Sequence, residues 1–180
     1  MSKRIYKVFV PKQAVGAAGL FYFDLWVPSK SPFTFELMAL QPIVSGAVAV
    51  TGVLGVDLFL RRTTAIGTGG TAMTQEGTST TAMTISDANG SQVADAASIT
   101  GRLTPTAGAT AGAVLAWTSV FTEETNAAAY GLTPDMVRNF YPDIPPMVIP
   151  ENSGIVVVQG AEAALVGNIG FNVFLRLTSK

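Results

Sequence analysis

Apolar and polar residues alternate along several stretches of this chain, a pattern that indicates β-strands with one face buried and the other exposed. The clearest stretches are residues 20–27, 33–40, 113–122 and 169–177. Within residues 47–64, Val56, Leu58 and Leu60 also occupy every second position, so their side chains are expected to point inward. The chain therefore reads as a series of strands with a shared apolar face.

Residues 20–27 and 33–40 are separated by a short segment, from Pro28 to Pro32, that has the composition of a turn. Phe23 and Phe35 lie on the apolar faces of the two strands. The spacing predicts that the strands pair as a hairpin with a common aromatic inner face.

Residues 145–160 predict two strands joined by a sharp corner. Pro150 has no N–H group, so a strand must end there. Residues 151–154 are polar and end in Gly154, which tolerates a positive φ. Residues 155–158 are an unbroken aliphatic run, typical of a strand buried on both faces. The segment is expected to form a corner of a β-sandwich.

The strand signals number about eight to ten, which is typical of a jelly roll. We therefore predict an all-β, jelly-roll-like β-sandwich, although another Greek-key sandwich would have a similar number of strands. One short helix is predicted at residues 133–140, because Thr133 suits an N-cap and Pro134 suits the first helical position.

A short repeat lies in the Gly-, Thr- and Ala-rich segment at residues 65–112. Residues 71–74 have the sequence Thr-Ala-Met-Thr, and residues 81–84 have the same sequence. Because it occurs only twice, the repeat does not indicate a solenoid. It predicts two short strands with similar roles.

The first twelve residues contain no acidic residue and four of the chain's eleven basic residues. These candidate contact residues are Lys3, Arg4, Lys7 and Lys12. The segment could be a solvated terminal arm, or an arm that docks on an acidic surface. We expect residues 1–12 to form a basic arm and residues 13–180 to form a single β-sandwich domain.

Composition narrows the possible partners. Only 13% of the 180 residues are charged, compared with about 25% in an average protein. A monomer with so few charges covers its apolar surface poorly, so self-association or a large partner is expected. The net charge of −1 gives no field that favours nucleic acid. No apolar run approaches the roughly 18 residues of a membrane span, so no membrane partner is expected.

The chain contains no cysteine and no histidine. This excludes thiol nucleophiles, Ser-His-Asp triads and histidine-based metal sites. A carboxylate-based glycosidase needs two facing acids, whereas the adjacent Glu123 and Glu124 would point to opposite faces of a strand. We therefore expect no enzymatic activity, no catalytic residue, no metal and no cofactor.

Two segments resemble the capsid decoration, or cement, proteins of tailed phages. The first runs from Arg61 to Thr74 and contains, from Arg62, the pattern R-x-T-x-x-x-x-G-G-T-A-x-T. The second runs from Pro145 to Val158 and contains, from Pro146, the pattern P-x-x-I-P-x-x-x-G-I. The family corner commonly has a Gly-Glu-Gly-like centre, and Asn152-Ser153 departs from it. No catalytic residue is carried over.

The resemblance implies a structural virion protein with a β-sandwich fold. Such a protein is made in the host cytoplasm, binds the major capsid protein on the outside of the shell, and stabilises it as a homo-oligomer, expected to be a trimer. The alternative hypothesis is a receptor- or carbohydrate-binding module of a fibre or spike. A shallow groove that groups Trp26, Trp117 or Tyr130 would favour the alternative.

Overall fold

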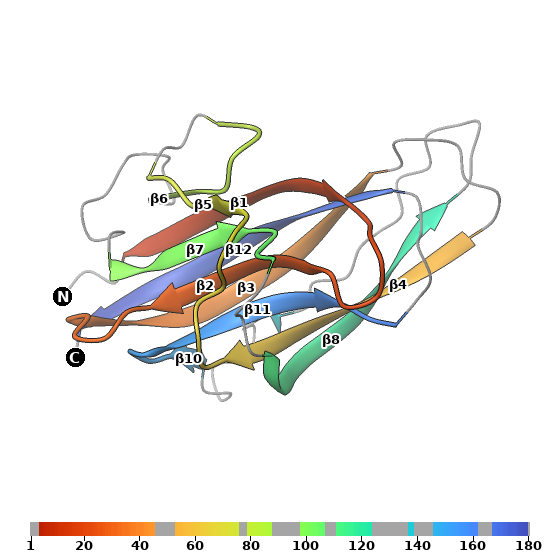
Figure 1. Cartoon of the computed structure of the whole chain (residues 1–180). Helices are drawn as coiled ribbons and strands as arrows, with labels where there is room; N and C mark the ends of the chain where they lie inside the picture. The colour runs from red at the N-terminus through yellow and green to blue at the C-terminus, as the bar shows by residue number, and fades with distance from the viewer. Residues whose placement is uncertain are drawn as a thin grey trace.

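The computed structural model describes residues 4–45, 53–75, 79–87, 98–106, 111–123, 137–138, 146–161 and 167–179. Within these ranges the chain forms β-strands in two antiparallel sheets and no α-helix (Figure 1). Sheet A contains β1 (Ile5–Ala14), β3 (Phe33–Ser45), β6 (Thr84–Asp87), β9 (Val137–Arg138), β10 (Met147–Ile149) and β12 (Asn168–Ser179). Sheet B contains β2 (Phe21–Val27), β4 (Val53–Thr63), β5 (Thr71–Ala72), β7 (Thr100–Leu103), β8 (Ala111–Glu123) and β11 (Ser153–Gln159).

The strand order is that of a jelly roll. Sheet A has the order β10-β3-β12-β1-β6, with β9 also beside β3, and sheet B has the order β5-β7-β2-β11-β4-β8. The first half of the chain pairs antiparallel with the second half: β1 with β12, β2 with β11, β3 with β10, and β4 with β8. This arrangement of eight strands in two sheets confirms the predicted fold class.

The predicted short helix is not confirmed. Val137 and Arg138 form β9, which pairs with Leu40 and Ala39 of β3. These two residues are therefore extended and not helical. The rest of the segment predicted as a helix, residues 133–136 and 139–140, lies outside the described residues.

The core lies between the two sheets and is built from the inward positions of both. Phe171 of β12 is at its centre, with ring centroids 5.6 Å from Tyr22 and 5.2 Å from Phe23, both of sheet B. Inward residues of β4 are fully buried, as predicted: Val56, Leu58 and Leu60. The core thus joins strands from opposite ends of the sequence.

The hairpin predicted from residues 20–27 and 33–40 is wrong. The first stretch forms β2 in sheet B, and the second forms part of β3 in sheet A, so they pair with different neighbours. Phe23 and Phe35 are both fully buried and approach the core from opposite sheets. Alternation shows which face of a strand is buried. It does not show whether two strands belong to one sheet or to two sheets that pack against each other across the same core.

The predicted boundary at residue 12 is also wrong, because residues 5–12 are part of the sandwich. Strand β1 lies inside sheet A, with β12 on one side and β6 on the other. Tyr6, Val8 and Val10 are almost completely buried in the core. The basic residues alternate with these apolar ones, so the segment has the period of a half-buried strand and is not a free arm.

The two copies of the short repeat close one side of the sandwich. Met73 donates a backbone hydrogen bond to Gly101 beside β7 (2.9 Å), and Thr74 donates one to Met83 (3.0 Å). Thr74 also forms a parallel bridge with Thr84, the first residue of β6. Residues 71–72 form the short strand β5, whereas only Thr84 of residues 81–84 belongs to a strand, so the prediction of two short strands holds for the first copy alone. Backbone hydrogen bonds join the two copies and continue from sheet B into sheet A at this edge.

The corner between β10 and β11 lies where it was predicted, but the residue with a positive φ differs. Asn152 has φ 51°, whereas Gly154 is not in the left-handed region. A Cβ at position 154 would lie 2.8 Å from Thr63 Cγ2 and 3.0 Å from Trp26 Cε3, and closer still to the Leu25 carbonyl oxygen. Glycine is required there because two neighbouring strands approach closely.

Candidate functional site

The outer face of sheet A carries two of the four cations that the sequence analysis selected, Lys7 and Lys12. Because Tyr6, Val8 and Val10 of β1 face the core, the alternate residues Lys7 and Phe9 face outward. Lys7 lies beside Phe174 of β12 and Ser86 of β6, and Phe9 lies beside Asn172 and Thr84. We call the outward side chains of β1, β3, β10 and β12 the basic face.

Exposed apolar side chains occupy one end of the basic face. Four residues of adjacent strands form a row there: Val148, Glu36, Arg176 and Ile5. Glu36 and Arg176 form an ion pair at the centre of the row. Val148 and Ile5 flank the pair and are 41% and 42% exposed. The row therefore offers an apolar surface on which the central charges are already paired.

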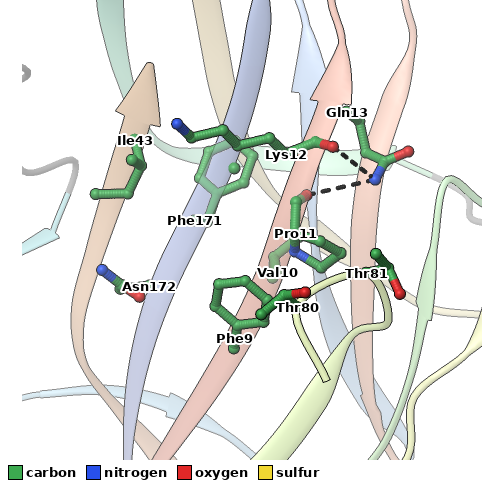
Figure 2. Close-up of a pocket in the computed structure, with 11 residues that line it drawn as sticks. Phe9, Val10, Pro11, Lys12, Gln13, Ile43, Thr80, Thr81, Phe171 and Asn172 are labelled. Atoms are coloured by element: carbon green, nitrogen blue, oxygen red, sulfur yellow. Dashed lines mark hydrogen bonds between the residues drawn. The ribbon is translucent and has the colours of Figure 1, made fainter. Parts of the chain in front are cut away.

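A cavity of about 600 Å³ lies at the other end of the basic face (Figure 2). Its apolar lining includes the half-buried Phe9 and Ile43, and Thr80 also lines it. Lys12 extends across β12 toward Ile43 and is exposed to solvent. A pocket of this size with few polar groups is typical of a ligand site.

A β-bulge in β1 shapes this cavity. The register with β12 shifts between Val10 and Gln13, which places Pro11 and Lys12 in the irregular part of the strand. Gln13 Nε2 donates hydrogen bonds to the carbonyl oxygens of Lys12 (3.0 Å) and Pro11 (3.4 Å), as Figure 2 shows. The bulge aims the Lys12 side chain across the sheet, a common use of such irregularities.

The structure brings together two of the four predicted contact residues. Lys7 and Lys12 belong to β1 and to the same face of sheet A, and only Lys12 lines the cavity. Arg4 is exposed directly before β1, and Lys3 lies outside the described residues. The cavity itself could not be found from sequence, because its walls come from β1, β3, β12 and the segment before β6.

A buried carboxylate on sheet B is a second feature that the sequence did not indicate. Asp24 is completely buried and accepts hydrogen bonds from the backbone N–H groups of Gly67 (2.6 Å) and Arg102 (2.8 Å). Burial raises the pKa of Asp24, and the two backbone donors oppose this shift. A Cβ at position 67 would lie 2.5 Å from Pro105 Cβ and 2.7 Å from Asp24 Oδ2. Asp24 thus fixes the loop that follows β4, a structural task.

The two tryptophans do not form a common groove. Trp26 of β2 is 9% exposed and Trp117 of β8 is 62% exposed. Strands β11 and β4 separate them in sheet B. Tyr130 lies outside the described residues, as does Glu124. The aromatic groove that would favour a carbohydrate-binding module is therefore not built from these two tryptophans.

Comparisons of the chain with protein-family models, curated proteins and solved structures gave no match. Among the residues that the structure describes, no helix is long and apolar enough to cross a membrane.

Proposed function

We propose that the chain is a structural, non-enzymatic virion protein that binds the outside of a phage capsid shell through its basic face and stabilises the shell. The observation that carries the proposal is the gathering of Lys7, Lys12, Ile5 and Val148 on one face of a rigid sheet. Cations among exposed apolar side chains suit an acidic and partly apolar protein surface. The partner in this proposal is the major capsid protein.

The fold and composition support a structural role. Jelly rolls occur in viral capsid proteins, lectins and cupins, so the fold alone does not select a function. The chain has no histidine, the residue on which cupin-type metal sites depend. Its low content of charged residues suits a protein that covers much of its surface with partners. The resemblance of residues 62–74 and 146–155 to decoration proteins adds weight in the same direction.

The binding energy per copy is expected to be small. Exposed ion pairs contribute roughly 0–1 kcal/mol each and are screened by salt. Many copies of the chain on one shell, or several faces within one oligomer, would add these small contributions through avidity. We therefore propose a homo-oligomer on the capsid surface, whose attachment weakens as the salt concentration rises.

Co-sedimentation with expanded, empty capsid shells tests the proposal. The wild-type protein is expected to sediment with the shells at low salt and less completely at high salt. The double variant Lys7→Glu/Lys12→Glu should bind much more weakly, because two attractive contacts become repulsive. Lys30→Glu is the matched control, since Lys30 is exposed in the turn between β2 and β3 and belongs to no strand of the basic face.

The co-sedimentation results distinguish a wrongly assigned contact surface from a wrongly assigned function. If the double variant binds as well as the wild type, the contact surface lies elsewhere on the sandwich. If the wild-type protein does not bind shells of any expansion state at low salt, the decoration function itself is wrong.

The cavity favours one alternative function, a receptor- or carbohydrate-binding module. The cavity is lined by the aromatic ring of Phe9 and by amide and hydroxyl groups from Asn172, Gln13 and Thr80. An aromatic ring with such polar groups is a combination that can hold a sugar ring. Binding to a glycan array that is lost in Phe9→Ala, together with no binding to shells, would favour this alternative. No glycan binding would leave the cavity as part of a protein contact.

A further inference from the structure

Strand β8 forms an open edge of sheet B with exposed apolar side chains. In the described residues it pairs with β4 and with no other strand. Trp117 and Val114 of β8 are 62% and 47% exposed, the two highest values among the large apolar residues that the structure describes as exposed. An open strand edge presents unpaired N–H and C=O groups, for which another strand is the natural partner.

This edge lacks the usual protection against pairing. Residues 111–122 contain no charged residue and no proline, and β8 is thirteen residues long. The opposite side of the sandwich is closed by the backbone hydrogen bonds of Met73 and Thr74, and β10 at the edge of sheet A has only three residues. Two register shifts bend the N-terminal part of β8, but β1 and β3 carry similar shifts and still pair on both sides.

From these features we infer that β8 pairs antiparallel with β8 of a second copy of this chain, joining the two B sheets into one continuous sheet around a two-fold axis. Trp117 is the middle residue of β8 and would lie beside this axis. The inference goes beyond shell binding and does not depend on it. It names the surface through which the chain associates with itself.

Charges on the neighbouring strand select a second copy, in the antiparallel direction, as the partner. On the outer face of sheet B, Arg61 of β4 lies beside Val114, and Asp57 of β4 lies beside Ser119 and accepts its hydrogen bond. The two opposite charges therefore flank Trp117 at comparable separations along the strand. A two-fold rotation about an axis at Trp117 places Arg61 of each copy at the same end of the contact as Asp57 of the other copy.

A parallel pairing would set Arg61 opposite Arg61 and Asp57 opposite Asp57 across the two β8 strands, roughly 14 Å apart, where the like charges repel weakly. The self-complementary pattern of one cation, an apolar centre and one anion thus fits a two-fold contact between identical chains.

The two-fold axis also determines the direction in which the two basic faces of a dimer point. A two-fold axis that relates neighbouring antiparallel strands runs perpendicular to their sheet, so both copies keep sheet A on the same side of the joined B sheet. The two basic faces of the dimer then point in the same direction. A dimer built at β8 can therefore place both faces on one surface, which is the geometry that avidity requires.

Sedimentation equilibrium of the full-length protein, combined with tryptophan fluorescence, tests the inference. The wild-type chain is expected to be a dimer at roughly 100 µM and to dissociate on dilution. Because the chain has only two tryptophans and Trp26 is buried, a red shift of the emission on dilution would report the exposure of Trp117. Trp117→Glu should be monomeric at the same concentration, and Ile5→Glu, an exposed apolar position on sheet A, should remain dimeric.

Charge reversal tests the direction of pairing. At low salt, Arg61→Asp alone and Asp57→Arg alone should each raise the dimer Kd by about two- to fivefold, because two symmetric attractions across roughly 14 Å become repulsions. The double variant Arg61→Asp/Asp57→Arg should recover most of the wild-type affinity, which a merely structural role of either residue would not produce.

Three outcomes would overturn the inference. One is a wild-type protein that stays monomeric at the highest concentration. Another is a dimer that Trp117→Glu does not weaken while the variant retains the wild-type circular dichroism spectrum. The third is a trimer, as the family resemblance implies, because three-fold closure requires a head-to-tail contact between different surfaces. None of these results bears on whether the basic face binds shells.

Discussion

Replacing Asp24 by alanine should destabilise the protein strongly, because the carboxylate satisfies two buried backbone donors. In Asp24→Ala the N–H groups of Gly67 and Arg102 lose their acceptor. A buried donor without a partner costs about 1–3 kcal/mol, so the two together cost about 2–6 kcal/mol. Removing a charge whose pKa is raised by burial returns part of this cost. We therefore expect a net loss in the lower half of that range, about 2–4 kcal/mol.

The expected loss is large enough to measure by calorimetry. For a domain of this size, 1 kcal/mol shifts Tm by about 2–4 °C, so Asp24→Ala should melt about 4–16 °C below the wild type. Asp57→Ala is the matched control: Asp57 is a half-buried carboxylate on the same sheet whose described partner is the Ser119 hydroxyl. Its Tm should change by no more than a few degrees.

Hydrogen exchange shows whether the loss occurs where the structure places it. In the variant, the amides of Gly67 and Arg102 should exchange faster, while the amides of β12 in the other sheet should change only in proportion to global stability. A Tm within about 2 °C of the wild type, with unchanged protection at Gly67, would refute the role assigned to Asp24.

Three further predictions concern pH, the corner and the first strand. Because burial raises the pKa of Asp24, the unfolded chain loses this proton at lower pH than the folded chain. The stability that protonated Asp24 contributes should therefore decline as pH rises from the ordinary pKa of an aspartate through the raised pKa of Asp24. Urea unfolding of the wild type and Asp24→Asn should show a difference in stability that shrinks across that pH window, and a difference that grows would contradict the direction of the pKa shift. Gly154→Ala should cost about 1–3 kcal/mol in urea unfolding, and Gly154→Val more, because the Cβ meets Thr63 and the backbone of β2; an unchanged midpoint would mean that the strands are farther apart than the structure places them. Deleting residues 1–14 should abolish cooperative thermal unfolding, since β1 is an inner strand of sheet A; a truncated protein that still melts cooperatively would restore the hypothesis of a free basic arm.

The segments whose face is set by local alternation were predictable from the sequence. The inward positions of β4 and β12 depend only on a period of two, which each strand carries within itself. Residues 155–158 are apolar at every position, which predicted a strand buried on both faces. The corner at Pro150 was also predictable, because a proline followed by polar residues and a glycine is typical of a turn. Strand count and corner together were enough for the fold class.

Local sequence patterns led to a wrong prediction where the clustering of charges and the alternation of apolar residues indicate different structures. Lys7 and Lys12 drew attention to a basic segment, yet Tyr6, Val8 and Val10 between them bury a strand in the centre of sheet A. The burial of these three side chains outweighs the cost of ordering two lysines that keep their charges at the surface. Lys7 and Lys12 therefore lie in a strand of the sandwich and not in a free arm, and their contact with a capsid stays a prediction.

Tertiary structure alone decided how the strands pair and which surfaces result. The turn at residues 28–32 could join two strands of one sheet or carry the chain from one sheet to the other, and only the packing of Phe23 and Phe35 into one core selects the second. Likewise, the acceptors and donors that meet at Asp24 lie on segments 43 and 78 residues away in sequence. The alternation in a sequence specifies which side of a strand is apolar. The neighbours of each strand are selected by the burial of all apolar faces at once. The basic face, the cavity and the open edge of β8 therefore exist only in the assembled sandwich.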